Sequence, residues 1–339
     1  MLNIGIIGVG SMGLIHSALI KKNKNYNFLA ACDRNTRQLD IIKNENKNLR
    51  CYQDYKELLK DQEIDFILIA TTNEHHESLT IEALESGKNV IVEKPMSLNY
   101  ESALRMIEAA EKFKKYLIVH HSRRWDKDFL IVKKYISSGI LGKILSIQTR
   151  VMLCDEGWPA WSSEGMINPW RIKAGGGGML LDWGAHLIDQ VLNIMGKNPK
   201  HVYGFIQKGV WSKEVEDYFY ASLKFESELI CQIEAGNNSL IPLPRWYLIG
   251  EKGTLLVKGS NIPVWDEVEI KQKNEFGIYE TKNIKLHGIK EISEGFYNDL
   301  IIYLEDKNKN FISMYEAAEV LKVIDAIRQS SDSNTIINF

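Results

Sequence analysis

The sequence predicts an α/β protein, in which a doubly wound parallel sheet is followed by an α+β domain with a large, mostly antiparallel sheet. Three observations support this. A short apolar strand runs directly into the glycine turn Gly8-Val-Gly10-Ser-Met-Gly13. Apolar runs and helical stretches then alternate over roughly the first 120 residues. Beyond that point, apolar and polar residues alternate, which is typical of strands with one buried face.

The first domain, residues 1–122, is predicted from apolar runs that are continuous, as in parallel strands buried on both faces. The predicted strands are Ile4–Ile7, Phe28–Cys32, Asp65–Ala70, Asn89–Val92 and Tyr116–Val119. Helices are predicted to begin at Leu14 and to cover Tyr55–Lys60, Glu77–Ser86 and Tyr100–Lys114. This alternation is the pattern of a Rossmann fold.

The second domain, residues 123–339, is predicted from shorter strands separated by glycine and asparagine turns. The predicted strands are Ile144–Leu153, His201–Lys208, Tyr218–Phe225, Leu229–Glu234, Trp246–Ile249 and Thr254–Val257. The predicted helices are Asp128–Ser137, a segment near Leu181–Met195 and Met314–Gln329. We expect this domain to bind the substrate and to carry the contacts between subunits.

Composition excludes several classes of protein. A chain of 339 residues is too long for one small core. Its net charge of −2 provides no long-range field for nucleic acid or an anionic membrane. The four cysteines are scattered without a C-x-x-C pair, which argues against a zinc ribbon or a disulfide framework. No apolar run approaches the ~18 residues of a membrane span, and the first residues form a core strand instead of a signal peptide. We expect a cytoplasmic protein.

The glycine turn predicts a dinucleotide site. Gly8 permits the tight turn, Gly10 lets the backbone approach a pyrophosphate, and Gly13 lets the following helix pack on the strand. The pyrophosphate is expected at the free N–H groups of that helix. Asp33 ends the second strand, where an acid accepts hydrogen bonds from a ribose and favours NAD. Arg34 follows it and could instead meet a 2′-phosphate, which leaves NADP open.

Two further clusters of residues could carry chemistry. Lys94 follows the strand Asn89–Val92, at the sheet edge where doubly wound folds bind ligands, although an ordinary surface lysine would look the same. Four glycines, 175–178, precede Asp182 and His186, which are spaced to share one helix face. Such glycines suit a close approach of backbone to a ligand, and a carboxylate beside an imidazole suits proton transfer. The alternative is a helix-capping acid and a core histidine. A metal site is a further alternative that stays open, but it lacks a third obvious ligand at metal spacing, and no metal is assigned.

Together these motifs resemble the glucose–fructose oxidoreductase, inositol dehydrogenase and rhizopine catabolism family (Gfo/Idh/MocA). The resemblance covers essentially the whole chain. It rests on Gly8-x-Gly10-x-x-Gly13, Asp33, Thr71-Thr72-Asn73-x-x-His76, Glu93-Lys94-Pro95, Asp182-x-x-x-His186-x-x-Asp189, and the bridge Arg123-Arg124-Trp125-Asp126 with Gly139-x-x-Gly142. Thr72 stands where the family usually has proline, which should alter only the stiffness of that loop.

The resemblance implies a role for each matching residue. Lys94, Asp182 and His186 are expected to be catalytic: His186 as general base, Asp182 as the group that orients it or the substrate, and Lys94 as hydrogen-bond donor to the reacting oxygen. The residues expected to bind the cofactor are Gly8, Gly10, Ser11, Met12, Gly13, Asp33, Arg34, Thr71, Thr72, Asn73, His76, Glu93 and Lys94.

Tryptophans cluster just before the four glycines, and large rings can cover the apolar face of a sugar. The candidate substrate contacts are Arg123, Trp158, Trp161, Trp170 and Arg171, with Asp182 and His186. The alternative is a tryptophan cluster within an interface. Arg245-Trp246 is a weaker candidate for the same role.

The leading functional hypothesis is an NAD(P)-dependent dehydrogenase that acts on a secondary alcohol of a sugar, sugar derivative or cyclitol. The resemblance leaves two alternatives: a glycosidase that retains NAD and uses transient oxidation, and a non-catalytic NAD-binding regulator. The expected partner is a small polyol or sugar. A homodimer or homotetramer is also expected, as in similar proteins.

Overall fold

The chain forms two compact units, and each is described by itself. The computed structural model describes residues 1–152, 169–210, 212–226, 228–241, 243–259, 265, 267–274, 276–286, 293–306 and 308–339. The first unit comprises Met1–Ser122 and Ser293–Leu321, and the second comprises Arg123–Ile292 and Lys322–Phe339. The sequence predicts one boundary, after residue 122. The structure differs in that Ser293–Leu321 belongs with the first unit, because aromatic side chains of this segment pack into it.

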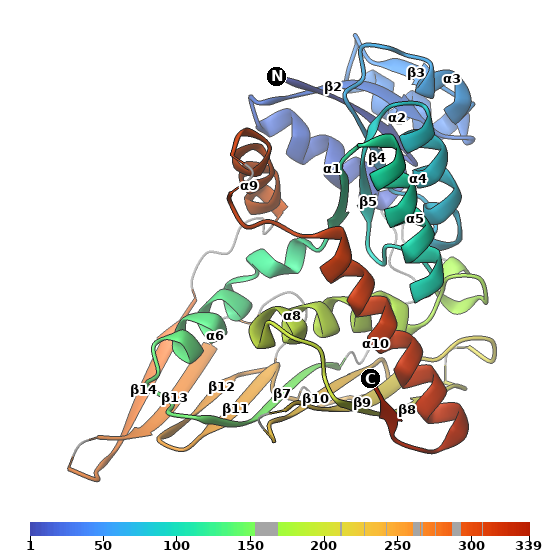
Figure 1. The fold of residues 1–339 in the computed structure, drawn as a ribbon. Coiled ribbons are helices and arrows are strands. Elements are labelled where there is room, and N and C mark those ends of the chain that lie inside the picture. Colours follow the sequence, from blue (N-terminus) through green and yellow to red (C-terminus); the bar gives the residue numbers. More distant parts are fainter. Residues whose placement is uncertain are drawn as a thin grey trace. The chain divides into compact units, whose positions relative to one another are not determined.

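The first unit is built on a parallel sheet with strand order β3-β2-β1-β4-β5-β6 (Figure 1). Strand order reverses direction at β1, which is the position where doubly wound sheets bind ligands. Its strands are β1 (Leu2–Ile7), β2 (Tyr26–Cys32), β3 (Arg50–Tyr52), β4 (Phe66–Ile69), β5 (Asn89–Glu93) and β6 (Leu117–His120). Its helical segments are α1 (Ser11–Lys22), α2 (Thr36–Asn44), α3 (Tyr55–Leu59), η1 (Asn73–His75), α4 (His76–Glu85), α5 (Tyr100–Phe113) and α9 (Ser293–Glu305).

The second unit is built on a sheet with strand order β14-β13-β12-β11-β7-β10-β9-β8-β15. All its pairs are antiparallel except β10 with β7, which run parallel. Its strands are β7 (Ile144–Met152), β8 (His201–Gln207), β9 (Tyr218–Lys224), β10 (Ile230–Gly236), β11 (Trp246–Gly250), β12 (Gly253–Val257), β13 (Glu267–Lys273), β14 (Tyr279–Lys285) and β15 (Ile337–Asn338). The predicted fold class is confirmed in both units.

Helices cover one face of this second sheet. They are α6 (Lys127–Ser137), α8 (Ala185–Met195) and the later turns of α10 (Met314–Ser333) (Figure 1). The chain also forms the short segments η2 (Ser122–Trp125), η3 (Pro169–Ile172) and η4 (Leu180–Gly184). Residues alternate along β9, where Phe219, Ala221 and Leu223 are buried. The other face carries exposed side chains such as Phe205 and Ile230. The alternation of apolar and polar residues therefore indicates one buried face, as predicted.

Several elements escape the sequence analysis for identifiable reasons. The segments α2 and β3 are short, so few residues carry their pattern. Strand β14 is exposed at six of its seven positions, so no apolar residue alternates along it. Such a strand is defined by its backbone pairing with β13 from Glu267 to Lys273. Pairing of this kind leaves little trace in composition.

Candidate functional site

The glycine turn between β1 and α1 has the shape that its sequence predicts. Gly8 has φ +91°, a conformation that glycine adopts without strain, and a Cβ there would stand 2.7 Å from the Ala70 carbonyl oxygen. A Cβ at Gly13 would overlap the Gly8 carbonyl oxygen. At Gly10, by contrast, a Cβ would meet no atom within 4 Å. Gly10 therefore borders open space beside the N-terminus of α1, where a pyrophosphate fits.

Asp33 is fixed beside this turn. Its Oδ2 atom accepts a hydrogen bond from the Val9 N–H at 2.9 Å, and its Oδ1 atom accepts one from the Asn35 N–H at 2.9 Å. Each carboxylate oxygen retains a lone pair for a further donor, such as a ribose hydroxyl. Arg34 is exposed next to it. The arrangement of Asp33 and Arg34 therefore matches the sequence prediction, which favours NAD and leaves NADP open.

The segment after β4 places Thr71, Thr72 and Asn73 at the carboxyl end of that strand. His76 is fully buried, and its Nδ1 and Nε2 atoms lie 2.8 Å from the Pro95 carbonyl oxygen and 3.2 Å from that of Thr71. Burial lowers the pKa of His76, although these carbonyl contacts oppose the shift. The sequence predicts a cofactor contact for this side chain. In the structure His76 lies buried between the carbonyl oxygens of Thr71 and Pro95, so its imidazole bridges two loops instead of facing a ligand.

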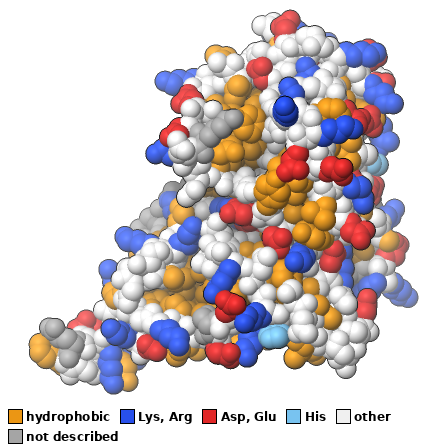
Figure 2. Space-filling view, viewed as in Figure 1, with side chains coloured by type: hydrophobic (Ala, Val, Ile, Leu, Met, Phe, Trp, Pro, Cys, Tyr) orange, Lys and Arg blue, Asp and Glu red, His pale blue; other side chains and the backbone are white. Residues whose placement is uncertain are grey.

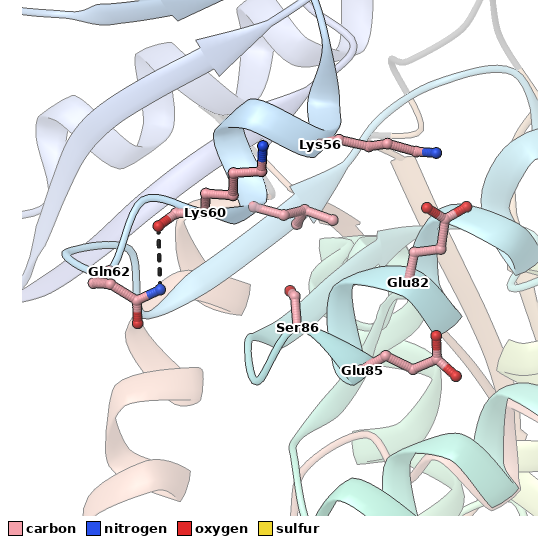
Figure 3. A pocket seen from close by; sticks show the side chains of 7 residues that line it. Lys56, Lys60, Gln62, Glu82, Glu85 and Ser86 are labelled. Carbon is pink, nitrogen blue, oxygen red and sulfur yellow. Dashed lines mark hydrogen bonds between the residues drawn. The ribbon is translucent and has the colours of Figure 1, made fainter.

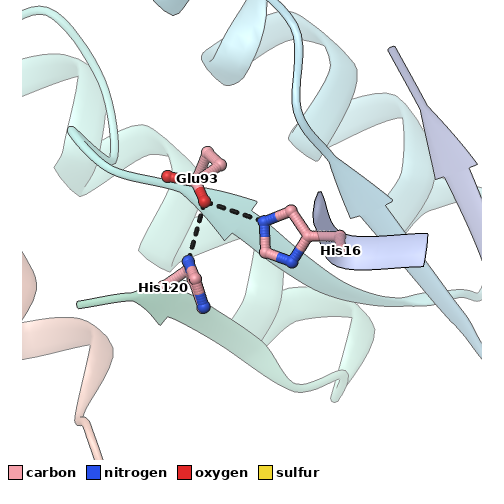
Figure 4. Close-up of side chains that lie close together, drawn as sticks. All are labelled: His16, Glu93 and His120. Atoms are coloured by element: carbon pink, nitrogen blue, oxygen red, sulfur yellow. Dashed lines mark hydrogen bonds and ion pairs between the residues drawn. The ribbon is translucent and has the colours of Figure 1, made fainter. Parts of the chain in front are cut away.

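Glu93 requires the same correction. Its carboxylate points into the interior, where Oε1 lies 2.8 Å from His16 Nε2 and 2.7 Å from His120 Nδ1 (Figure 4). The Oε2 atom accepts a hydrogen bond from the Lys94 N–H at 3.0 Å. With both oxygens engaged and little exposure, Glu93 does not face a ligand. Lys94 itself is only half-buried and follows β5 at the sheet edge.

The second unit brings Asp182 together with Arg171. Asp182 lies in the π-helical turn η4, and His186 lies in the first turn of α8. The sequence predicts that the two share the face of one regular helix. The structure instead places a π turn at Asp182, a feature that is frequent at functional sites. The Arg171 Nε–H donates to Asp182 Oδ2 at 3.2 Å, and both side chains are buried.

The structure explains why two of the four positions, 177 and 178, require glycine, which the sequence does not reveal. A Cβ at Gly177 would stand 2.5 Å from the carbonyl oxygens of Trp170 and Arg171, and one at Gly178 would overlap the Glu216 carboxylate. Glu216 Oε1 accepts the Leu180 N–H at 2.9 Å, at the start of the π turn. Burial raises the pKa of Glu216. The predicted close approach at these two glycines is therefore to the protein's own groups.

Arginines next to the catalytic candidates are also held by the protein. The Arg123 guanidinium lies 4.3 Å from the centre of the Trp183 ring and donates to Asp126 Oδ2 at 2.9 Å. The Trp183 ring centre is in turn 5.8 Å from that of His186. Arg123 thus lies near the candidate base, and its expected contact with the substrate stays a prediction. Trp170 is half-buried, and its ring centre lies 4.5 Å from the Arg171 guanidinium.

Arg245 does not fit the role of a substrate contact. Its side chain is fully buried, where it donates to Thr149 and, at 2.6 Å, to Gln190 Oε1. Asp128 Oδ2 lies 3.3 Å from its Nε atom. A residue enclosed in this way stabilises the core beneath α8. The candidates Trp158 and Trp161 lie outside the described residues.

The sequence predicts no role for four side chains that the structure places in these sites: His16, His120, Glu216 and Tyr297. Only His16 leaves a signal, since a histidine on the inner face of the helix after a glycine turn is unusual in a core. The other three come from segments remote in sequence. Among the described residues, His16, Glu93 and His120 also form the one group of three potential metal ligands, with ligand atoms within 4.8 Å of one another.

A separate hollow of about 360 Å³ lies between α3 and α4 (Figure 3). It is lined by Lys56, Leu59, Lys60, Gln62, Glu82, Glu85 and Ser86. It is open and lined by long charged side chains, and it includes none of the motif residues. We therefore assign the candidate site to the motifs. Charges of both signs are interspersed over the face of the molecule in Figure 2, in keeping with the net charge of −2.

Among the helices that the structure describes, none combines the length and the apolar character that a membrane crossing requires.

Comparison with known proteins gives a consistent result. Residues 2–121 match the Gfo/Idh/MocA profile described as an oxidoreductase family with an NAD-binding Rossmann fold, and residues 129–256 match a Gfo/Idh/MocA C-terminal domain. A myo-inositol 2-dehydrogenase of Thermotoga maritima is 30% identical over 276 residues, which cover 78% of this chain and 79% of the relative. An NADP⁺-dependent scyllo-inositol 2-dehydrogenase of Bacillus subtilis is 29% identical over 262 residues, which cover 76% and 69%.

The solved structure of an NAD-binding protein from Listeria innocua is 31% identical and has a TM-score of 0.85, covering 99% of this chain and 96% of that one. These matches confirm the resemblance drawn from the motifs and the predicted class of dinucleotide cofactor. The chain therefore belongs to the Gfo/Idh/MocA family of oxidoreductases, with an NAD-binding Rossmann fold in its first domain.

Proposed function

We propose that this protein is an NAD(P)-dependent dehydrogenase that oxidises a secondary alcohol of a sugar, sugar derivative or cyclitol. The observation that carries the proposal is the buried Arg171–Asp182 pair at the helix that bears His186. The pair fixes the orientation of a carboxylate four positions before the candidate base. Relatives named as inositol dehydrogenases support the substrate class.

The residues of the first unit fit a dinucleotide. Open space at Gly10 and the N-terminus of α1 suit a pyrophosphate, and the fixed Asp33 carboxylate suits the ribose hydroxyls of NAD. Arg34 would offset the repulsion between Asp33 and a 2′-phosphate. We favour NAD and keep NADP as the alternative, since one of the inositol dehydrogenase relatives is named for NADP⁺.

The chemistry would divide among Lys94, Asp182 and His186. A bound nicotinamide supplies the hydride acceptor. His186 removes the proton of the substrate hydroxyl as general base. Lys94 donates a hydrogen bond to the same oxygen and stabilises its developing negative charge. Asp182, held by Arg171, orients the hydroxyl, and the half-buried Trp170 contacts the sugar or cyclitol ring.

The test is a panel of inositols, aldoses and glycosides with NAD or NADP, followed by the absorbance of the reduced nicotinamide. Net reduction with a polyol is the expected result, and the preferred cofactor settles the competition between Asp33 and Arg34. Release of an aglycone without net reduction would replace the proposal by a redox-assisted glycosidase. Cofactor binding without turnover of any compound, in a chain that keeps Lys94, Asp182 and His186, would favour a regulator.

We also propose that the open face of the second sheet joins two copies of the chain. Phe205 pairs with Tyr220 in register on this face, and Tyr203, Phe205 and Ile230 on the same face are exposed. Exposed apolar side chains grouped on one face are typical of an interaction surface. Light scattering after gel filtration tests this, with a dimer or tetramer expected for the native chain and a shift toward monomer for Phe205→Glu.

A further inference from the structure

A buried network of polar side chains surrounds Glu93, and the proposed reaction makes no direct use of it. His16 comes from α1, His120 ends β6, and Tyr297 comes from α9. All three are at least 98% buried. The Glu93 Oε1 atom is the common acceptor for the two imidazoles, and Figure 4 shows both rings directed at it. A buried carboxylate with this many partners has one defined position.

Proton positions in this network follow from its chemistry. Burial lowers the pKa of His16, with proximity to His120 acting in the same direction, so His16 is neutral. Its one proton belongs on Nε2, because Glu93 can only accept when ionised. The Nδ1 atom then accepts from the Tyr297 hydroxyl at 2.6 Å, and burial raises the pKa of that hydroxyl, which keeps its proton. Burial opposes ionisation of Glu93, but the two histidines lower its pKa well below the usual range.

One line of hydrogen bonds therefore runs from α9 to Lys94. The Tyr297 O–H donates to His16, the His16 Nε2–H donates to Glu93 Oε1, and Glu93 Oε2 accepts the Lys94 N–H at 3.0 Å. Separately, the Tyr297 carbonyl oxygen accepts the Tyr26 hydroxyl at 2.7 Å, a hydrogen bond that lies outside this line. Removal of one member would release the Glu93 carboxylate and, with it, the backbone at Lys94.

We propose that His16 and Tyr297 are positioning residues, which act through Glu93 to hold Lys94 where the reaction needs its ammonium group. The inference rests on the proposed function for the role of Lys94, but not for the existence of the network. It gives a function to α9, a late segment of the chain that packs in the first unit. It also explains why the acid next to Lys94 faces inward.

The same three side chains could be taken for a metal site, and the geometry argues against this. His16 Nε2 and His120 Nδ1 lie 2.8 and 2.7 Å from one carboxylate oxygen, which are ordinary hydrogen-bond lengths. The second nitrogen of His16 is engaged by Tyr297. At these lengths a hydrogen bond joins each imidazole nitrogen to the carboxylate oxygen.

The experiment compares His16→Leu, His16→Gln and Tyr297→Phe, with Tyr26→Phe as matched control. Leucine removes both hydrogen bonds of His16, whereas glutamine keeps an N–H donor for Glu93. Tyr26→Phe removes a buried tyrosine hydrogen bond from the same aromatic cluster without touching His16. The first readout is acetylation of the Lys94 amine in the cofactor-free chain, measured by peptide mass spectrometry against the exposed Lys60. The second is kcat and the cofactor KM.

In His16→Leu we expect roughly a tenfold fall in kcat with cofactor KM within about twofold, and about a threefold change in Lys94 acetylation. Tyr297→Phe should change kcat and Lys94 acetylation in the same direction as His16→Leu, but by a smaller factor. The double variant should not differ from His16→Leu. His16→Gln and Tyr26→Phe should stay near the native values, even where melting temperature falls.

Three results would overturn the proposal. They are unchanged Lys94 acetylation in folded His16→Leu, an equal change in Tyr26→Phe, and a stoichiometric metal in the purified native protein. If Lys94 acetylation responds as expected but no substrate is turned over, the positioning role stands and the proposed function fails.

Discussion

The two units hold their candidate site residues in different ways. In the first unit, the Gly8 turn and the strand end at Asp33 belong to short contiguous motifs, and backbone shape defines them. In the second, Asp182 and His186 depend on charged side chains from distant segments. Arg171 binds Asp182, Glu216 begins the π turn, and Arg124 binds Asp189 one turn beyond His186.

This difference predicts how substitutions should disrupt each site. A site made by backbone shape should fail through steric overlap, whereas a site held by ion pairs should fail through uncompensated charge. Substitutions in the two units test this contrast, and the largest effect is expected at His186.

Replacement of His186 by alanine should give the largest effect. If His186 is the general base, kcat should fall by roughly 10²–10⁴-fold at neutral pH, while the cofactor dissociation constant changes little. Steady-state kinetics and quenching of reduced-nicotinamide fluorescence measure the two quantities. His75→Ala is the control, since the His75 side chain in the first unit is 44% exposed. Near-native turnover in the alanine variant would refute the assignment.

Disruption of the Arg124–Asp189 pair should be the next largest effect. Asp189 is 98% buried and accepts three hydrogen bonds from Arg124, between 2.6 and 3.1 Å. Arg124→Met leaves that carboxylate without its cation and should cost about 3–5 kcal/mol of stability. Asp189→Asn in the same background should recover part of the loss. Urea unfolding of the single and double variants measures both, and equal stability of the two would contradict an ion-pair origin.

The glycine turn should respond to shape. Gly13→Ala forces a Cβ into the Gly8 carbonyl oxygen and should cost about 3 kcal/mol of stability. Gly10→Ala places the same methyl group in open space, so stability should change by no more than about 0.5 kcal/mol. Cofactor affinity should nevertheless fall roughly tenfold in Gly10→Ala, an energy of about 1.4 kcal/mol. Unfolding and cofactor titration separate the two variants, and undiminished affinity in Gly10→Ala would place the pyrophosphate elsewhere.

The same contrast explains how far the sequence could be read. Gly8, Gly13 and Asp33 act through spacing and local backbone, so their positions were predictable from contiguous residues. The inward orientation of Glu93 was not, because His16, His120 and Tyr297 come from three remote segments. Likewise, the lack of room for a Cβ at Gly178 is due to Glu216, a residue 38 positions away, and no local pattern records that contact.

The smallest expected effect concerns pH, where the two units should behave in opposite ways. The histidines lower the pKa of Glu93, so its contribution to stability is present at neutral pH and is lost in acid, as pH falls through that lowered pKa. Burial raises the pKa of Asp126 from 3.8 to about 6, with repulsion from Asp128 adding to burial and attraction to Arg123 and Arg245 opposing it.

Asp126 therefore gives the sharper test. Between pH 3.8 and about 6, the folded chain keeps a proton on Asp126 that the unfolded chain has lost, so stability from this group declines as pH rises through that window. The full shift corresponds to at most about 3 kcal/mol, and 1–2 kcal/mol is a realistic order of magnitude after partial relaxation. Asp126→Asn cannot titrate. It should gain stability relative to the native chain on going from pH 4 to pH 7, as measured by urea unfolding at both values. An identical pH dependence in the two proteins would mean that Arg123 holds Asp126 ionised throughout, and the charge network of the second unit would then be balanced without a bound proton.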